Sequence, residues 1–211
     1  MRPEFFWQVW GAHMKAITFD WGGVFTQNTF DGRSTGRIAE RYNLDVEKVR
    51  AVYFAHVHQL ELGKWTLETF FENLMQEVGF TAPLEEIIEL YLGSVYENPP
   101  MYDFLPTIPA EFKVGLLSNN YPVLSDRLKA DPRWARFDAM VYSNEIGFKK
   151  PSPESFHALV EATGVPAQDS VFIDDVEENL VAARALGFST ILYHYAEHDR
   201  FLKELEAWMN R

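Results

Sequence analysis

Short apolar runs rich in β-branched and aromatic residues recur along the chain and predict five β-strands. Runs without regular polar alternation are typical of strands that are buried on both faces of a parallel sheet. The last four runs are separated by stretches with the apolar spacing of helices, which indicates βαβ units and a parallel sheet between two layers of helices. The runs cover residues 16–19, 113–117, 139–142, 171–173 and 190–193.

A helical pattern fills the long stretch between the first and second predicted strands. Asp45 and Thr66 can each cap a segment whose apolar residues recur at three- and four-residue spacing. A further helix is expected from Pro83 to about Glu97, and the proline pair that starts at Pro99 is expected to end it. Because the stretch is far longer than a usual connection between a strand and a helix, we expect it to fold as an insertion.

The two patterns together predict an α/β protein with a Rossmann-like three-layer core, a parallel sheet and a small α-helical cap inserted after the first strand. The core is expected to comprise residues 14–27 and 100–211, and the cap residues 28–99. Residues 1–13 lack the features of a signal peptide and end in Gly11-Ala12-His13, which resembles a cloning scar. We expect residues 1–13 to be a vector-derived or disordered extension.

The net charge of the 211-residue chain limits the classes of molecule that it can bind. A formal net charge of -12, from 19 basic and 31 acidic residues, argues against nucleic acid or an anionic membrane as the main partner. A small anionic substrate remains compatible, because a lysine and backbone amides can outweigh the mean charge locally. The chain has no cysteine and no apolar run near the ~18 residues of a membrane helix. We expect a cytoplasmic protein without thiol chemistry, and the sequence leaves its oligomeric state open.

Polar side chains stand at the carboxyl ends of three predicted strands, at Asp20, Ser118 and Asp174. Ligands of open parallel sheets bind beyond these ends, so the three groups are expected to converge on one crevice. Gly22 and Gly23 follow Asp20 and allow a sharp turn with backbone amides close to an anion. A carboxylate held there can attack a phosphoryl group that a divalent cation and a lysine make electrophilic. Strand termination or helix capping is the alternative role of Asp20.

Two further segments offer groups that could hold a phosphate. Ser118 and Asn119 precede a helix expected after Pro122, where a hydroxyl and amide N–H groups can bind phosphate oxygens. An ordinary helix cap is the alternative. Lys150 is followed by a proline that fixes the local backbone, which suits a lysine directed into a site. A solvated surface position is the alternative for Lys150, and its neighbour Lys149 could be mistaken for it.

Asp174 and Asp175 form a pair of adjacent carboxylates at the end of an apolar run. Such neighbours repel each other unless a cation or a lysine compensates them. Oxygen ligands suit Mg²⁺, which usually takes one or two protein carboxylates and keeps several waters. We expect Asp175 to bind the metal directly and Asp174 to contact a metal-bound water or Lys150, while Asn179 steadies the loop.

In this order, the segments around Asp20, Ser118, Lys150 and Asp174 resemble the four motifs of the haloacid dehalogenase superfamily, whose members are hydrolases with an aspartate nucleophile. The position of the insertion and the segment 61–71 resemble the small-cap branch, which includes sugar-phosphate phosphatases and the phosphatase domain of soluble epoxide hydrolase. The resemblance implies a magnesium-dependent phosphatase of a small phosphorylated metabolite that works through an aspartyl-phosphate intermediate.

The resemblance also implies a role for each matching residue. Asp20 would attack phosphorus, and Lys150 would share in catalysis. The phosphoryl group would be bound by Trp21, Gly22, Ser118, Asn119 and Lys150, and magnesium by Asp20, the Gly22 carbonyl oxygen, Asp174 and Asp175.

One position departs from the phosphatase pattern. Phosphatases of this superfamily usually carry a second aspartate two residues after the nucleophile, which protonates the leaving group and later activates water, and this chain has Gly22 there. A positioned acid–base group typically contributes about 10²–10⁴ in rate. The chain therefore favours leaving groups that need little protonation, such as anomeric or acyl phosphates, or a cap residue replaces the aspartate, or turnover is lost. The cap candidates are Asp31, His56 and His58.

Two other functions stay open on the sequence alone. Metal-independent 2-haloacid dehalogenases also lack the second aspartate and also use a Ser-Asn pair, although the paired carboxylates Asp174 and Asp175 weigh against this reaction. The other alternative is a catalytically weak domain that binds a phosphorylated metabolite and has a regulatory or scaffolding role.

Overall fold

Five parallel strands form the sheet at the centre of the molecule, in the order β3-β2-β1-β4-β5. The computed structural model describes residues 14–28 and 30–211, so the predicted extension, residues 1–13, lies outside the described residues. Each strand lies within one residue of a predicted apolar run at both ends. The strands are β1 Ala16–Phe19, β2 Lys113–Ser118, β3 Ala139–Tyr142, β4 Ser170–Asp174 and β5 Ser189–Leu192.

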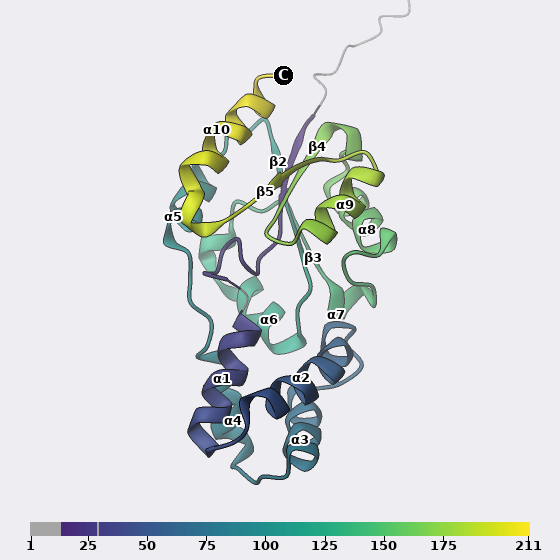
Figure 1. The fold of residues 1–211 in the computed structure, drawn as a ribbon. Helices are drawn as coiled ribbons and strands as arrows, with labels where there is room; N and C mark the ends of the chain where they lie inside the picture. Colours follow the sequence, from purple (N-terminus) through teal and green to yellow (C-terminus); the bar gives the residue numbers. More distant parts are fainter. Residues whose placement is uncertain (1–13, 29) are drawn as a thin grey trace, which may run out of the picture.

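Helices cover both faces of the sheet and make the predicted three-layer α/β core. Strand side chains alternate between two hydrophobic clusters, so that Val171 and Ile173 contribute to one and Phe172 to the other. Figure 1 shows α8 and α9 on one side of the sheet and α5 and α10 on the other. The bounds of these helices are α5 Pro99–Phe104, α8 Pro153–Thr163, α9 Glu177–Ala185 and α10 His198–Met209, and α6 Pro122–Ala130 and α7 Ser143–Ile146 follow β2 and β3.

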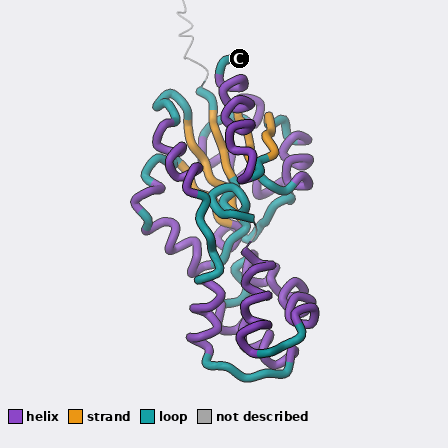
Figure 2. Tube along the Cα trace, turned by 60° about the vertical axis from the view of Figure 1, so that its left-hand side comes forward, coloured by secondary structure: helices purple, strands orange, loops and turns teal. Residues whose placement is uncertain are grey.

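The first four of the helices between β1 and β2 form a bundle beyond the carboxyl ends of the strands (Figures 1 and 2). We call this bundle the insertion. The predicted caps are confirmed, since the side chain of Asp45 accepts a hydrogen bond from the amide of Glu47, and that of Thr66 from the amide of Thr69. The helices are α1 Phe30–Tyr42, α2 Val46–Glu61, α3 Leu67–Val78 and α4 Leu84–Leu92. Within the described part of the chain, no helix combines the length and apolar character needed to cross a bilayer.

The last helix of the insertion differs from the prediction. It ends at Leu92, where the Gly93 amide donates to the Glu89 carbonyl, rather than near Glu97. The prediction that Pro99 ends a helix is wrong, because Pro99 begins α5. A proline fits the first helical turn, where its missing N–H would have no helical acceptor and its fixed φ matches the helix.

The two connections between the core and the insertion lie side by side. Thr26 and Glu97 form an antiparallel bridge, and the Asn98 amide donates to the Phe25 carbonyl at 2.9 Å. The buried Asn98 side chain donates to the Val24 carbonyl and to the Tyr193 hydroxyl, each at 2.7 Å. These bonds anchor the returning chain to the turn after β1, while the predicted limits of the insertion, residues 28–99, stay a prediction.

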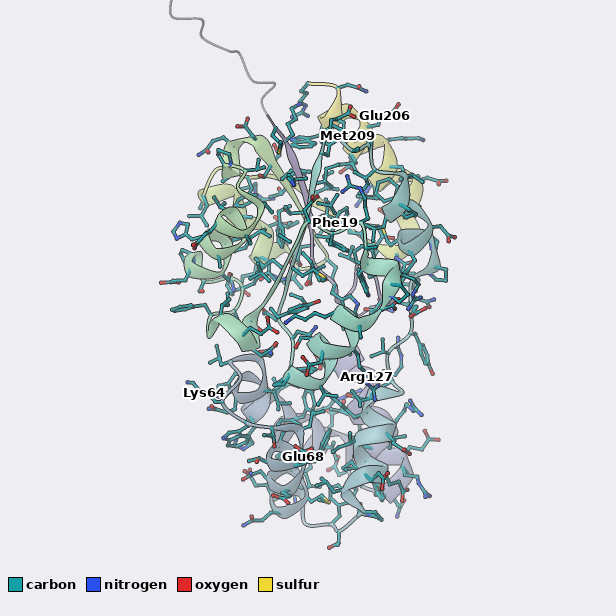
Figure 3. All side chains as sticks on the ribbon, turned by 180° about the vertical axis from the view of Figure 1, so that it is seen from behind. Phe19, Lys64, Glu68, Arg127, Glu206 and Met209 are labelled. Carbon is teal, nitrogen blue, oxygen red and sulfur yellow. The ribbon has the colours of Figure 1, made fainter. Side chains whose placement is uncertain are left out.

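The hydrophobic core runs through the sheet and continues into the insertion. Figure 3 shows Phe19 near the centre of the core, Lys64 and Glu68 on the insertion, and Met209 at the opposite end of the molecule. The Phe19 side chain is fully buried and belongs to the same cluster as the insertion's own buried side chains. This continuous packing holds the insertion against the carboxyl ends of the strands.

Candidate active site

Strand register brings the predicted polar groups to one edge of the sheet. Central β1 pairs with both β2 and β4, and Phe19 lies opposite Leu116 on one side and Ile173 on the other. The Asp20 amide donates to the Ile173 carbonyl at 2.8 Å, which places Asp20 beside Asp174. The predicted convergence is therefore confirmed for Asp20 and Asp174.

Lys150 is buried between two carboxylates. Its Nζ lies 2.7 Å from Asp20 Oδ1 and 2.7 Å from Asp174 Oδ2, and the residue is only 2% exposed. Asn119 fixes the backbone of this lysine, because its side chain donates to the Lys150 carbonyl and accepts from the Lys150 amide. The alternative of a surface lysine is excluded for Lys150. The neighbouring Lys149 instead pairs with Glu61 of α2, at 2.5 Å.

Asp174 has both carboxylate oxygens occupied by protein donors. Oδ1 accepts from the Val176 amide at 2.8 Å, and Oδ2 accepts from Lys150. The Asn179 amide nitrogen lies 3.2 Å from Oδ1 and 3.0 Å from Oδ2. Asp174 thus holds Lys150 and the following loop in place, and Asn179 supports it as expected.

Asp175, in contrast to Asp174, has a carboxylate oxygen without a protein donor among the described residues. Its Oδ1 is buried and has no hydrogen-bond partner among the described residues. Oxygen atoms of Asp20, Asp174 and Asp175 all lie within 4.8 Å of one another. A buried, unpartnered carboxylate oxygen beside two further carboxylates is costly without a cation, so this donor set fits a hard divalent metal ion.

The electrostatics of the cluster follow from burial and crowding. Burial raises the pKa of Asp20, the nearby Asp174 and Asp175 carboxylates raise it further, and Lys150 opposes the rise. Burial and then Asp174 raise the pKa of Asp175 to about 6. Burial opposes the charge of Lys150, but Asp174 and Asp20 outweigh it and raise the pKa of this lysine. The three acids together exceed what one lysine compensates, which leaves the site short of positive charge.

A cavity of about 160 Å³ opens beside this cluster and reaches the insertion. Ser118 is 1% exposed and is not among the described residues that line the cavity, so its predicted contact with phosphate stays a prediction. The wall from the core is formed by Asp20, Trp21, Gly22, Asn119, Tyr121, Lys150, Asp175, Val176 and Asn179, and the wall from the insertion by Asp31 and Glu61.

The three acid–base candidates of the insertion differ in whether they line the cavity. Asp31 lines the cavity, whereas neither histidine belongs to its described lining. His56 lies 2.7 Å from Glu77 Oε1 and stacks on Trp65, and His58 contacts Gln59. Sequence reasoning missed Glu61 and Tyr121 as lining residues, because their places depend on how the insertion packs on the core rather than on a local pattern.

Several known proteins are similar to this chain. D-ribitol-5-phosphate phosphatase of Bacteroides thetaiotaomicron is 25% identical over 84% of this chain and 90% of its own length. Bifunctional epoxide hydrolase 2 of Sus scrofa is 28% identical over 70% of this chain, a match that spans only 28% of that protein. A crystal structure of a HAD family enzyme from B. thetaiotaomicron in complex with magnesium and inorganic phosphate has a TM-score of 0.75 at 23% identity, covering 87% of this chain and 96% of that one.

The family itself is established by a match that covers most of the chain. A family model for haloacid dehalogenase-like hydrolases matches residues 14–187, which include Asp20, Lys150 and the Asp174-Asp175 pair. The sequence resemblance, the parallel sheet and the acidic cluster at its carboxyl edge agree with this match. The chain belongs to the haloacid dehalogenase-like hydrolase family.

Proposed function

We propose that this chain is a magnesium-dependent phosphomonoesterase of a small phosphorylated metabolite, with Asp20 as the nucleophile. The observation that carries the proposal is the pairing, in one cavity, of a lysine-bound Asp20 with the unpartnered, buried oxygen of Asp175. A phosphatase among its relatives supports the same reaction class. The crystal structure of the HAD family enzyme that holds magnesium and phosphate supports the same fold.

The reaction we propose uses the chain's own residues in two stages. An Asp20 oxygen attacks phosphorus, and the bond between phosphorus and the leaving oxygen breaks to give an aspartyl phosphate. Water then attacks this phosphorus and restores the Asp20 carboxylate. Lys150 lies against Asp20 and balances negative charge on the phosphoryl oxygens, while Asp174 and Asn119 hold the lysine in place.

Magnesium is the cofactor we propose for the acidic cluster. Asp20, Asp175 and the Gly22 carbonyl oxygen would hold it, and Asp174 would stay with Lys150 and Asn179. The all-oxygen donor set and the small number of carboxylates suit Mg²⁺. When bound, the ion supplies the positive charge that the site lacks and makes the phosphoryl group more electrophilic.

Dehalogenation is less well supported than phosphate transfer. A metal-independent dehalogenase needs no third carboxylate beside its nucleophile. Here Asp175 is partly buried with an unpartnered oxygen, an arrangement that costs folding free energy unless a cation uses it.

The charge of the insertion suggests the substrate class. Both ionisable residues that the described part of the insertion contributes to the cavity wall are carboxylates, Asp31 and Glu61. The phosphoryl group occupies the end with Lys150, so the leaving group faces these two carboxylates. We propose a leaving group that is neutral and hydroxyl-rich, or cationic, rather than one with a second phosphate or carboxylate. The ribitol phosphate named for one relative has a leaving group of the neutral, hydroxyl-rich kind.

Phosphate release is the measurement that tests this function. Wild-type protein should hydrolyse polyol and monosaccharide monophosphates with Mg²⁺, and the hydrolysis should stop in EDTA. It should hydrolyse sugar bisphosphates and phosphorylated carboxylic acids poorly. Asp20→Asn removes the nucleophile and should lower turnover by at least about 10⁴-fold, since loss of an essential nucleophile reaches or exceeds this size. Asp126→Asn is the matched control, because Asp126 is an exposed residue of α6 and is not among the described residues that line the cavity.

Three results would count against the proposal in different ways. Equal turnover by wild type and Asp20→Asn would remove Asp20 from the chemistry. Fluoride or chloride release from 2-haloacids in EDTA would favour the dehalogenase. Binding of a phosphorylated metabolite without any release of phosphate would favour a regulatory or scaffolding domain.

A further inference from the structure

The turn after Asp20 provides no acid for the leaving group, because its second residue is Gly22. Cleavage of an alkyl phosphate leaves an alkoxide unless a proton reaches the leaving oxygen. The group that delivers this proton must stand where the leaving group lies, on the side of the cavity opposite Lys150. The wall of the insertion supplies the candidates there, Asp31 and Glu61.

Asp31 lies in the first turn of α1, and its two carboxylate oxygens have different surroundings. The hydroxyls of Tyr53 and Tyr121 both donate to Oδ1, the latter at 3.1 Å. Oδ2 accepts no hydrogen bond from any residue that the structure describes. The two tyrosines come from the insertion and from the core, so they fix the Asp31 carboxyl group across the boundary between these units.

Glu61 is a poorer candidate for proton transfer. Its carboxylate pairs with Lys149 at 2.5 Å, so a cation already occupies it. Asp175 and Asp174 belong to the acidic cluster at the phosphoryl end. Asp31 is therefore the carboxyl group of the described cavity wall that lies outside the acidic cluster and forms no ion pair with a described residue.

We propose that Asp31 is the catalytic acid–base residue of this enzyme and replaces the aspartate that is missing at Gly22. The proposal rests on the proposed phosphatase function. In the first stage, the protonated Asp31 carboxyl group gives its proton to the leaving oxygen as the bond to phosphorus breaks, so that a neutral alcohol departs. In the second stage, the Asp31 carboxylate takes a proton from the water that attacks the aspartyl phosphate. One proton leaves and one returns in each cycle, and the residue ends as it began.

The surroundings of Asp31 favour the protonated form that the first stage needs. Burial raises the pKa of this carboxyl group, and nearby Glu61 adds to the rise. Hydrogen bonds from Tyr53 and Tyr121 act in the opposite direction, and so does Lys149. Tyr91 contacts the same cluster through the Tyr53 hydroxyl, and burial raises the pKa of all three tyrosines, so they act as neutral donors.

The dependence on the leaving group tests the proposal. An acid is needed most by an alkyl phosphate and least by 4-nitrophenyl phosphate, whose leaving group is stable as an anion. We expect Asp31→Asn to lower kcat/KM for alkyl phosphates by about 10²–10⁴-fold, the usual contribution of a positioned acid. The loss for 4-nitrophenyl phosphate should be at least tenfold smaller. Equal losses on both substrates would show that Asp31 only positions substrate and would overturn the proposal.

Two further measurements guard against a variant that fails to fold. Gly22→Asp in the Asp31→Asn background should recover alkyl phosphate turnover, because a Cβ on Gly22 meets no atom within 4 Å and leaves room for the usual aspartate. In wild type alone, kcat/KM across a series of aryl and alkyl phosphates should depend weakly on leaving-group pKa. A steep dependence on leaving-group pKa in wild type would overturn the proposal without measurements on any variant.

The outcomes for Asp31 and for the proposed function are distinguishable. If wild type releases no phosphate from any substrate, the phosphatase function fails and the role of Asp31 fails with it. If wild type and Asp126→Asn are both active while Asp31→Asn loses activity equally on aryl and alkyl phosphates, the phosphatase function stands and only the acid–base role fails.

Discussion

At the scale of single residues, two adjacent glycines of the turn after β1 differ in whether a side chain could replace them. A Cβ on Gly23 would lie 2.0 Å from Asp175 Oδ2, and the residue has a φ of +70°, which L-residues rarely adopt. Gly22 has no positive φ, and its Cβ would meet nothing within 4 Å. The missing side chain at Gly23 therefore lets the Asp175 carboxylate lie directly against the turn that carries Asp20.

Gly23→Ala is expected to weaken magnesium binding. The new methyl group pushes the Asp175 carboxylate out of the cluster, and the left-handed backbone adds a strain of roughly 1–2 kcal/mol. Because displaced metal ligands and their supports typically cost about 10–100-fold in affinity, the Mg²⁺ concentration for half-maximal turnover should rise by at least tenfold. Titration calorimetry with Mg²⁺ measures the same change directly.

Gly22→Ala serves as the control for this substitution. It adds the same methyl group one residue earlier, without a clash and without a positive φ, so its melting temperature should stay near that of wild type. An unchanged magnesium affinity in Gly23→Ala would mean that Asp175 is not a ligand or that its carboxylate has another place to bind the ion.

Individual site residues differ in how far their sequence predicts them. Asp20 and Lys150 follow from local signals, a strand end before two glycines and a lysine before a proline. The rank of Asp31 above His56 and His58 does not follow from any local signal, because it depends on which side of each insertion helix faces the core. Contacts between units that are distant in sequence decide this, and a single sequence carries no direct record of them.

At the scale of elements, the loop between α2 and α3 packs closely against α7. A Cβ on Gly63, whose φ is +67°, would lie 2.2 Å from the Asn144 carbonyl oxygen. Two residues earlier, Glu61 pairs with Lys149, which adjoins the buried Lys150. This contact joins the insertion to the core beside the cavity. Displacement of the loop would therefore also move Glu61, which lines the cavity.

Gly63→Ala should therefore destabilise the protein and impair substrate binding together. The left-handed conformation costs about 1–2 kcal/mol, and the backbone clash adds to it, so we expect a loss of about 2–4 kcal/mol in the free energy of unfolding. The shifted loop should also raise KM for the substrate. Urea denaturation and steady-state kinetics measure the two effects.

Gly79→Ala isolates the contribution of the clash. Gly79 ends α3 with a φ of +87°, but a Cβ there would meet nothing within 4 Å. In this variant the free energy of unfolding should fall only by the cost of the left-handed backbone, about 1–2 kcal/mol. Its KM should stay at the wild-type value. Equal losses in the two variants would mean that the contact with Asn144 has no energetic importance.

The elements themselves were predictable to different degrees. The five strands match their apolar runs because a strand buried on both faces leaves no position for polar residues. Helix α1 was not assigned from the sequence, since Gly32 and Gly36 lie inside it and glycine disfavours a helix. The misplaced boundary at Pro99 has a similar cause, because a proline can end one helix or begin the next, and the sequence permits both.

At the scale of the whole molecule, the active-site cluster adds like charges to a chain that is already acidic. The net charge is -12, and three carboxylates with oxygens within 4.8 Å of one another share one lysine. The sequence predicts that Asp20 and Asp174 lie at the same edge of the sheet, but not that β1 and β4 are neighbours whose register places the two carboxylates side by side. Folding the metal-free protein must overcome this repulsion, so an ion that binds the cluster should stabilise the whole fold.

Magnesium is expected to raise the melting temperature in the absence of any substrate. An ion that binds only the folded state at 100 times its Kd adds about 2.7 kcal/mol. For a chain of this length, each kcal/mol raises the melting temperature by roughly 2–4 °C, so the total rise should be about 5–10 °C. Differential scanning calorimetry at pH 7.5 in EDTA and in excess MgCl₂, with KCl at matched ionic strength, measures this shift.

Asp175→Asn separates metal binding from general charge screening. Burial and Asp174 raise the pKa of Asp175 to about 6, so at pH 7.5 its ionised form opposes folding, and this penalty is present above pH 6 and disappears as the pH falls toward 4. The neutral asparagine removes the penalty, and the variant should melt above wild type in EDTA at pH 7.5. It should also lose most of the magnesium shift, because a direct ligand is gone. If wild type responds no more to MgCl₂ than to KCl, the acidic cluster is not a magnesium site, and its like charges must be relieved by protonation of Asp20 or Asp175.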